Sequence, residues 1–253
     1  MIRMFQLEKG RVVAITGATR GIGRAIALGF AEAGATIALL QRDPTNTTIK
    51  DEVEALGVRC EIIPCDLIDH EQVKAAVPEV IRQLGSIDIL VNNGGIQRRS
   101  PAVDFSEEDW NDVLQVNLTA VWTLCQQAGK YMVPKKSGKI INIASLVSFQ
   151  GGITVPAYTA AKGAVGQLTK ALANEWASHH VNVNAIVPGY IDTEMNTALI
   201  NDETRSRQIL ERIPADRWGT PSDFVGPALF LASDASNYVH GHLLAVDGGW
   251  LGR

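Results

Sequence analysis

Tyr158 and Lys162 stand four positions apart at the start of a stretch with helical pattern. This spacing places both side chains on one face of a helix, one turn apart. A free tyrosine has a pKa of about 10 and is a poor base at neutral pH. We expect the ammonium of Lys162 to stabilise the phenolate and to lower the pKa of Tyr158. The pair could then donate or accept the proton that accompanies hydride transfer.

Two polar residues upstream could complete such a site. Ser145 ends an expected strand, at the sheet edge where open α/β folds bind their ligands. Taken alone, Ser145 fits a strand-end cap equally well. Asn117 lies in an expected helix between Val116 and Leu118, and these apolar neighbours argue against an asparagine that faces solvent. Asn117 and Ser145 therefore join the candidate catalytic residues.

A glycine-rich turn separates the first apolar run from the first helical pattern. Its spacing is G-x-x-x-G-x-G, with a threonine in front. Glycines allow a tight turn, and the helix N-terminus then offers N–H groups and a positive dipole end to a pyrophosphate. The strand before it and the helix after it are the context that predicts dinucleotide binding. The candidate cofactor residues here are Gly17, Arg20, Gly21, Ile22 and Gly23.

Short apolar runs alternate with helical patterns along all 253 residues. Runs that are apolar on both faces predict a parallel sheet covered on both sides. We therefore expect one α/β domain over residues 1–253, a doubly wound Rossmann fold with seven parallel strands. The expected strands are 12–16, 36–40, 60–64, 87–93, 139–145, 181–187 and 243–249. The expected helices are 22–33, one that follows a polar stretch from Thr45 and ends near Gly57, 69–84 with Pro78 inside, 107–132 with one break, 158–177, 202–211 and 222–231.

Composition excludes several classes of protein. The formal net charge of −4 and the pI of about 5.7 argue against a nucleic-acid partner. The sequence has no apolar run long enough for a membrane span, and its first ten residues do not read as a secretory signal. Three cysteines at irregular spacing predict reduced, buried thiols and a cytoplasmic protein. His240 and His242 lack a third ligand, so no metal is expected.

The glycine turn and the Ser145…Tyr158-x-x-x-Lys162 arrangement resemble the short-chain dehydrogenase/reductase family. The resemblance covers essentially the whole chain, and Asn92-Asn93-Gly94-Gly95 resembles the family's N-N-A-G motif with Gly94 in place of alanine. It implies a catalytic tetrad that includes Asn117, and a homotetramer, in which we expect Trp250 at an interface. It also implies cofactor contacts by Asp66, Leu67, Asn93, Gly94, Tyr158, Lys162, Pro188, Gly189, Ile191 and Thr193.

The residue after the second strand bears on the choice of cofactor. An acidic residue there would bind the ribose hydroxyls of NAD, but this chain has Gln41 followed by Arg42. The family resemblance places Arg20 at the same ribose. Two guanidiniums without a carboxylate favour the 2′-phosphate of NADP(H). Asp43, one position further on, leaves NAD(H) open.

Three segments resemble a narrower group, the 2-deoxy-D-gluconate 3-dehydrogenases, also described as 2-dehydro-3-deoxy-D-gluconate 5-dehydrogenases. These segments are residues 95–100, 148–152 and 246–251. The resemblance implies an oxidoreductase acting on a secondary alcohol or ketone of a sugar acid. Arg98 or Arg99 could hold the substrate carboxylate, and Gln150 and Ser145 could bond its hydroxyls; the two arginines fit a surface or subunit contact as well. Two alternatives stay open: a 3-oxoacyl-carrier-protein reductase or broad ketone reductase, and a cofactor-binding regulatory protein.

Overall fold

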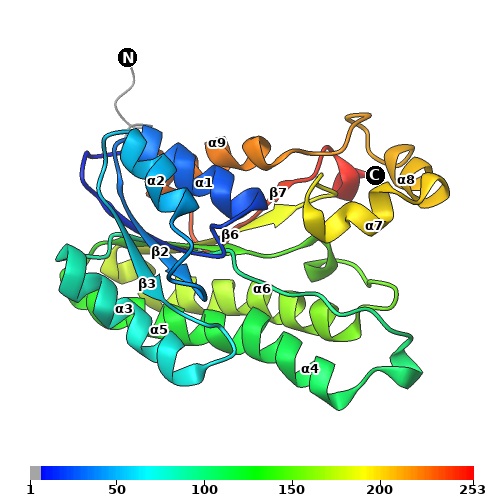
Figure 1. Cartoon of the computed structure of the whole chain (residues 1–253), viewed down its shortest axis with the longest axis horizontal. Helices are drawn as coiled ribbons and strands as arrows, with labels where there is room; N and C mark the ends of the chain where they lie inside the picture. The colour runs from blue at the N-terminus through cyan, green and yellow to red at the C-terminus, as the bar shows by residue number, and fades with distance from the viewer. Residues whose placement is uncertain (1–6) are drawn as a thin grey trace.

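The computed structural model describes residues 7–253, which form an α/β domain around one seven-stranded sheet (Figure 1). All neighbouring strands are parallel, in the order β3-β2-β1-β4-β5-β6-β7. This is the predicted doubly wound fold. The strands are β1 (Val12–Thr16), β2 (Thr36–Gln41), β3 (Cys60–Pro64), β4 (Ile89–Asn92), β5 (Gly138–Ile143), β6 (Val181–Pro188) and β7 (Leu243–Val246).

Helices cover both faces of the sheet, which explains why the central strands are apolar on both sides. All the residues of β1, β4 and β5 are buried. The upper layer in Figure 1 contains α1 (Gly21–Glu32), α2 (Thr48–Ala55) and α9 (Val225–Ala232). The lower layer contains α3 (His70–Leu84), α4 (Glu107–Leu114), α5 (Ala120–Lys135) and α6 (Pro156–Trp176).

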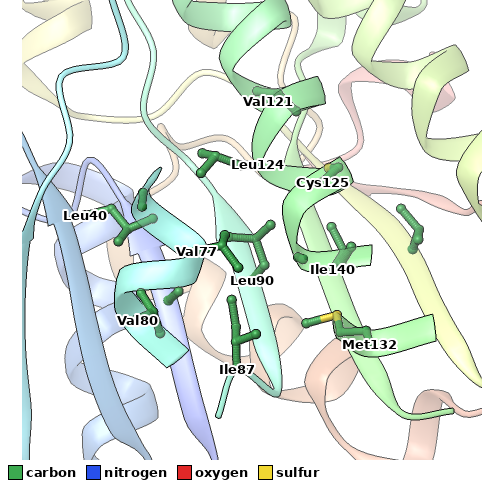
Figure 2. Close-up of a cluster of buried hydrophobic side chains, with 14 of the residues drawn as sticks. Leu40, Val77, Val80, Ile87, Leu90, Val121, Leu124, Cys125, Met132 and Ile140 are labelled. Atoms are coloured by element: carbon green, nitrogen blue, oxygen red, sulfur yellow. The ribbon is translucent and has the colours of Figure 1, made fainter. Parts of the chain in front are cut away.

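Each layer has its own hydrophobic core. The lower core joins α3, α5 and α6 to the sheet. Figure 2 shows part of it, where the helices meet β2, β4 and β5. The upper core packs α1 and α9 on the other face of the sheet. The labelled residues of the lower core are Leu40, Val77, Val80, Ile87, Leu90, Val121, Leu124, Cys125, Met132 and Ile140.

The structure corrects several element boundaries. Helix α3 continues through Pro78 and is capped by Asp69, whose carboxylate accepts hydrogen bonds from the amides of Glu71 and Gln72. The break expected within 107–132 is a single π-helical turn, Gln115–Thr119, between α4 and α5. Helix α6 begins at Pro156, because proline suits the first turn of a helix. The expected helix 222–231 begins as a 3₁₀ turn, Pro221–Phe224, and continues as α9.

Two helices flank the carboxyl edge of the sheet beyond β6. The predicted helix over 202–211 is observed as α8 (Glu203–Leu210). The short α7 (Thr197–Ile200), which was not predicted, precedes it. Both lie at the right of Figure 1, near the C-terminus.

The expectation that Trp250 lies at a subunit interface is wrong. Its side chain is 4% exposed within this chain and packs on Tyr190, with ring centroids 4.7 Å apart. The guanidinium of Arg212 lies over the Trp250 ring, 4.1 Å from the ring centroid. The aromatic contact and the cation–π contact together hold the C-terminal segment against the domain.

The three cysteines, Cys60, Cys65 and Cys125, are free and buried, as predicted. Burial raises the pKa of each thiol to about 12, so all three are protonated and unreactive at neutral pH. Among residues 7–253, no helix is both long and apolar enough to cross a membrane.

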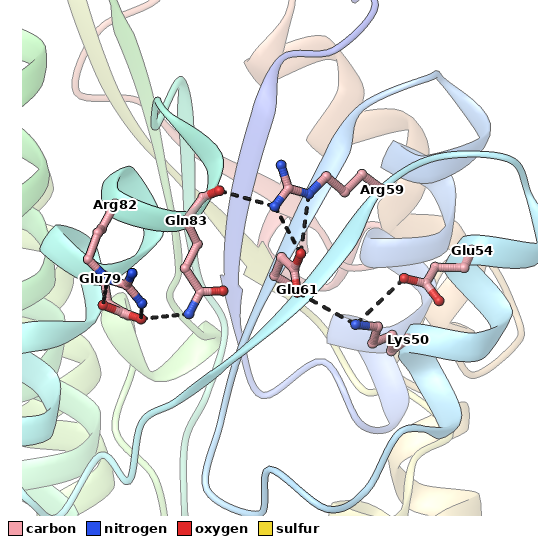
Figure 3. A network of polar contacts seen from close by, with 7 residues as sticks. All are labelled: Lys50, Glu54, Arg59, Glu61, Glu79, Arg82 and Gln83. Carbon is pink, nitrogen blue, oxygen red and sulfur yellow. Dashed lines mark hydrogen bonds and ion pairs between the residues drawn. The ribbon is translucent and has the colours of Figure 1, made fainter.

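Charged side chains form a network of polar contacts at the surface around β3 (Figure 3). Glu61 pairs with Arg59 at 3.0 Å and with Lys50 at 3.5 Å, and Glu79 pairs with Arg82 on α3. Ion pairs at the surface contribute little to stability because solvent screens them. The stability of the fold therefore depends on its apolar cores, which include a third, smaller cluster around Trp250.

Two helical glycines should respond in opposite directions to alanine. A Cβ at Gly29 of α1 would meet a methyl of Val225 at 2.4 Å, whereas a Cβ at Gly163 of α6 meets nothing within 4 Å. Gly163→Ala should raise the free energy of unfolding by about 0.5–1 kcal/mol through helix propensity. Gly29→Ala should lower it by about 1–3 kcal/mol, because the stiff valine must move. Urea denaturation measures both, and a gain in stability for Gly29→Ala would contradict the tight α1–α9 packing.

Candidate active site

The site lies where the order of the strands reverses, between β1 and β4, at their carboxyl ends. In open α/β sheets the ligand crevice forms at this switch point. The glycine turn follows β1, with Gly17 at φ 65° and Gly21 at φ 56°, values that favour glycine. A Cβ at Gly17 would meet the Cα of Gly94 at 2.8 Å. The turn therefore lies against the segment after β4, and side chains at these positions would close the space between them.

Asn93 fastens the two segments together. Its Nδ2 donates to the carbonyl of Thr16 at 3.1 Å and to that of Gly17 at 2.9 Å. In return the hydroxyl of Thr16 accepts hydrogen bonds from the amides of Asn93 and Gly94. This bonding holds the turn open toward the first turn of α1, whose amide groups have no side-chain cap. The arrangement fits a pyrophosphate at a helix N-terminus.

The departure from the family motif at Gly94 has a local cause. A Cβ there would meet Cδ1 of Leu67 at 2.6 Å and the hydroxyl of Thr16 at 3.2 Å. Leu67 and Asp66 lie in the loop after β3, beside the same crevice. In this chain the Leu67 side chain occupies the space that an alanine methyl would need.

The candidate catalytic residues come together on the next two elements. Ser145 follows β5, and Tyr158 and Lys162 lie on the first turns of α6. The Ser145 hydroxyl hydrogen-bonds that of Tyr158. The ammonium of Lys162 lies 5.7 Å from the centre of the Tyr158 ring and donates to the carbonyl of Ile143 at 2.5 Å. A hydroxyl pair with a buried amine beside it can pass a proton to an oxygen bound at this edge.

The expected lowering of the Tyr158 pKa is wrong for the free chain. Burial raises the pKa of Tyr158, and the Ser145 hydrogen bond and the charge of Arg99 offset only part of that effect. Burial also lowers the pKa of Lys162 to about 8. The reason is that both groups are desolvated while the ammonium is turned toward the Ile143 carbonyl.

Asn117 lies in the π-helical turn and is fully buried. Its side chain accepts from the amide of Ile96 at 2.9 Å and donates to the carbonyl of the same residue at 2.8 Å. The prediction that Asn117 does not face solvent is confirmed. π-helical turns are frequent at functional sites, and this one fixes the loop that carries Arg98 and Arg99.

The segment after β6 forms the opposite wall of the crevice. A Cβ at Gly189, which follows Pro188, would meet the Cα of Asp247 at 2.6 Å, so the backbones are in close contact. Ile191 is buried. Thr193 lies over the glycine turn, with its methyl 3.6 Å from where a Cβ of Gly21 would stand. The sequence-predicted cofactor residues after β1, β4 and β6 thus lie side by side at the carboxyl edge of the sheet.

The two arginines predicted at the ribose differ in their surroundings. Arg42 is exposed after β2 and makes no ion pair with any residue from 7 to 253. Arg20 forms a salt bridge with Glu194, which lies beyond Thr193 on the opposite wall. Gln41 is buried, and its Nε2 donates to the carbonyls of Asp43 and Asn46. Gln41 therefore stands where an NAD site would carry an acid, and its side-chain amide stabilises the loop that follows β2.

The structure separates Arg98 from Arg99. Arg98 pairs with Asp109 of α4 at 2.9 Å. Arg99 donates to the side chain of Gln97 and forms no ion pair within residues 7–253. Partial burial and the charge of Arg205 on α8 lower the pKa of Arg99, and the neighbouring Tyr158 and Tyr190 oppose that shift. Arg99, not Arg98, thus lies within electrostatic range of the candidate catalytic tyrosine.

Gln150 has a partner inside the chain, since its Oε1 accepts from the indole of Trp250 at 3.3 Å. Both residues line a hollow of about 460 Å³, together with Phe149, Arg212, Leu251 and Arg253. The Nε2 of Gln150 makes no side-chain hydrogen bond within residues 7–253. A contact between Gln150 and a substrate hydroxyl therefore stays a prediction.

Three residues near the crevice were missed from the sequence: Tyr190, Glu194 and Arg205. Tyr190 follows the Pro-Gly pair directly, which is the one signal that could have indicated it. Glu194 lies outside every expected element, and Arg205 lies within the expected helix 202–211, where no motif distinguishes it from the other polar residues. Their partners are 174 and 106 positions away, on other elements. Only the folded chain brings them to the site.

Fold and site together define a nucleotide-dependent oxidoreductase of the short-chain type. A family model described as Enoyl-(Acyl carrier protein) reductase matches residues 17–251. The chain belongs to the short-chain dehydrogenase/reductase family. The resemblance seen in the sequence is confirmed.

Within that family the similarity is to sugar-acid dehydrogenases. The chain is 52% identical to the 2-dehydro-3-deoxy-D-gluconate 5-dehydrogenase of Pseudoalteromonas atlantica over 100% of both chains. A crystal structure described as a "putative NAD(P) dependent gluconate 5-dehydrogenase" from Beutenbergia cavernae, with NADP bound at low occupancy, is 48% identical. It covers 99% of this chain and 100% of its own, with a TM-score of 0.95. A gluconate 5-dehydrogenase from Burkholderia cenocepacia, in complex with NADP and tartrate, is 41% identical over 99% and 98% of the chains, with a TM-score of 0.95.

The buried amine should leave a signature in the pH dependence of stability. The pKa of Lys162 falls from its ordinary 10.5 to about 8 on folding. Between these pH values the unfolded chain holds a proton that the folded chain has lost, so stability rises with pH. The free energy of unfolding of wild type minus that of Lys162→Met should therefore increase by up to about 1.4 kcal/mol per unit between pH 8 and 10. Urea titrations at each pH measure this difference; a constant difference would refute the shift.

Proposed function

We propose that this chain is an NADP(H)-dependent oxidoreductase that interconverts a secondary alcohol and a ketone of a sugar acid. The observation that carries the proposal is the Ser145–Tyr158 hydroxyl pair with Lys162 beside it, at the sheet edge shared with the glycine turn. The names of the relatives support the substrate class. They favour a sugar acid over an acyl chain, and the intact site argues against a purely regulatory protein.

Each of the four candidate catalytic residues has a defined task in this reaction. NADP(H), when bound, supplies or accepts the hydride. In the reductive direction Tyr158 donates its phenolic proton to the carbonyl oxygen, and Ser145 holds that oxygen by a hydrogen bond. The raised pKa of Tyr158 keeps its hydroxyl protonated and ready to donate. Lys162 then stabilises the phenolate by its charge, and Asn117 holds the adjoining loop through Ile96.

The residues around the crevice fit the cofactor. The tight contacts of Gly17 and Gly23 with Asn93 and Gly94 leave backbone amides facing the pyrophosphate position. The exposed guanidinium of Arg42 and the absence of an acid at Gln41 support a 2′-phosphate. NADP in two similar solved structures supports the same choice.

Arg99 is the residue that we assign to the substrate carboxylate. Its charge acts on Tyr158, and the charge of Arg205 acts on Arg99, while neither arginine forms an ion pair within residues 7–253. Two like charges side by side repel each other, and a bound carboxylate relieves that repulsion. The tartrate bound to the Burkholderia cenocepacia enzyme is itself a small hydroxy acid with carboxylate groups.

We also propose a cytoplasmic homotetramer organised as a single domain. Trp110 of α4 and Trp122 of α5 are 38% and 40% exposed, which supports a subunit contact along these helices. The three reduced thiols support a cytoplasmic site.

The first test removes only one oxygen atom. Tyr158→Phe should abolish turnover of keto sugar acids and of neutral ketones alike while NADPH still binds, because only the proton donor is lost. Tyr238→Phe is the matched control, since Tyr238 is fully exposed. Turnover is followed by nicotinamide absorbance and binding by nicotinamide fluorescence. Full activity of Tyr158→Phe would refute the mechanism.

The second test uses adjacent arginines. Arg99→Ala should raise KM for acidic sugars by about tenfold or more, consistent with about 1.5–3 kcal/mol for a charged hydrogen bond. Neutral ketones should be affected little. Arg98→Ala removes the same charge from a side chain already paired with Asp109, so its effect should be small. Equal effects of the two variants, or equal effects on acidic and neutral substrates, would remove Arg99 from the carboxylate site.

A further inference from the structure

One ion pair spans the mouth of the cofactor crevice. Arg20 is the residue before α1, in the glycine turn, and Glu194 begins the 3₁₀ turn Glu194–Asn196 beyond β6. Their side chains form a salt bridge although they are 174 positions apart in the sequence. Both side chains are largely exposed, at 72% and 70%. The pair therefore connects the two walls between which a dinucleotide must lie.

The segment that carries Glu194 is braced from within the chain. The side chain of Asn196 donates to the carbonyl of Ile191 at 2.8 Å, and the backbone amide of Asn196 donates to the carbonyl of Thr193 at 2.9 Å. The backbone of Asp192 donates to Gly219 at 2.8 Å. These bonds hold the carboxylate of Glu194 at the end of a fixed turn, so that it faces Arg20 from the opposite wall.

The neighbouring cations at the entrance are unequal. Arg24, one turn along α1 from Arg20, is paired with Glu52 of α2 at 2.5 Å. Within residues 7–253, Arg42 alone of these three guanidiniums makes no ion pair. A phosphate that approaches Arg20 must share the guanidinium with Glu194 and is repelled by that carboxylate. It meets no such competitor at Arg42.

We propose that Glu194 is a specificity-determining residue, which restrains Arg20 by ion pairing and so limits how strongly the chain prefers a 2′-phosphorylated dinucleotide over an unphosphorylated one. The inference rests on the proposed function, in which Arg20 and Arg42 lie at the adenosine ribose. The preference for NADP(H) over NAD(H) then depends on how well the 2′-phosphate competes with the carboxylate of Glu194 for the guanidinium of Arg20.

The test compares two loss-of-charge variants in the same segment. Glu194→Gln keeps the size of the side chain and frees Arg20. Asp192→Asn removes the same charge two positions away, from an exposed residue with no ion pair in the described chain. Dissociation constants of NADPH and NADH are measured by fluorescence titration at two ionic strengths. The same measurements are made on Arg20→Ala and on the Arg20→Ala/Glu194→Gln double variant.

We expect Glu194→Gln to tighten NADPH binding by about threefold, the scale of an exposed ion pair, while NADH binding stays unchanged. The gain should shrink at high salt and vanish in the Arg20→Ala background. Asp192→Asn should leave the ratio of the NADH dissociation constant to the NADPH dissociation constant as in wild type. An equal change of the ratio in both single variants, or a gain that persists without Arg20, would overturn the role of Glu194.

The two proposals can fail separately. If wild type does not bind NADPH, or if Arg20→Ala leaves the ratio unchanged, the placement of the cofactor is wrong and the role of Glu194 falls with it. If Arg20→Ala lowers the ratio of the NADH dissociation constant to the NADPH dissociation constant, but Glu194→Gln does not raise that ratio, only the role of Glu194 is overturned.

Discussion

The bonding between the ends of β1 and β4 is the constraint on which the rest of the site depends. The two strands are neighbours at the point where the strand order reverses, so their following segments diverge and leave a crevice. The amide of Asn93 holds the carbonyls of Thr16 and Gly17, and glycine on both segments lets the backbones meet. The upper core holds the body of α1 on the sheet, and this junction fixes the glycine turn before α1 against the segment after β4.

Burial determines the chemistry of the candidate catalytic pair. Lys162 is 4% exposed, and burial lowers its pKa to about 8, while burial raises the pKa of Tyr158. Both shifts favour the uncharged forms, so the free site holds a protonated phenol beside a readily titrated amine. The charge of Arg99 opposes the shift of Tyr158, so the arginine that we assign to the substrate carboxylate also acts on the proton donor.

The arginines around the crevice differ in whether the protein itself neutralises them. Arg98, Arg24 and Arg20 each have a carboxylate partner from another element. Arg42 and Arg99 form no ion pair within residues 7–253. Unneutralised guanidiniums are the ones available to anionic ligands, and they stand at the two ends of the crevice where we place the 2′-phosphate and the substrate carboxylate.

The sequence by itself determined the alternation of strands and helices, the glycine turn and the Tyr158–Lys162 spacing, because these depend on local periodicity and on residues close in the chain. It also carried the family resemblance. It did not determine that the break in 107–132 is a π-helical turn at Asn117, that Trp250 is buried within the chain, or which way the pKa of Tyr158 shifts. Only the tertiary structure decided that Arg20 and Arg24 are paired, because their partners Glu194 and Glu52 lie 174 and 28 positions away on other elements and their positions depend on the whole fold.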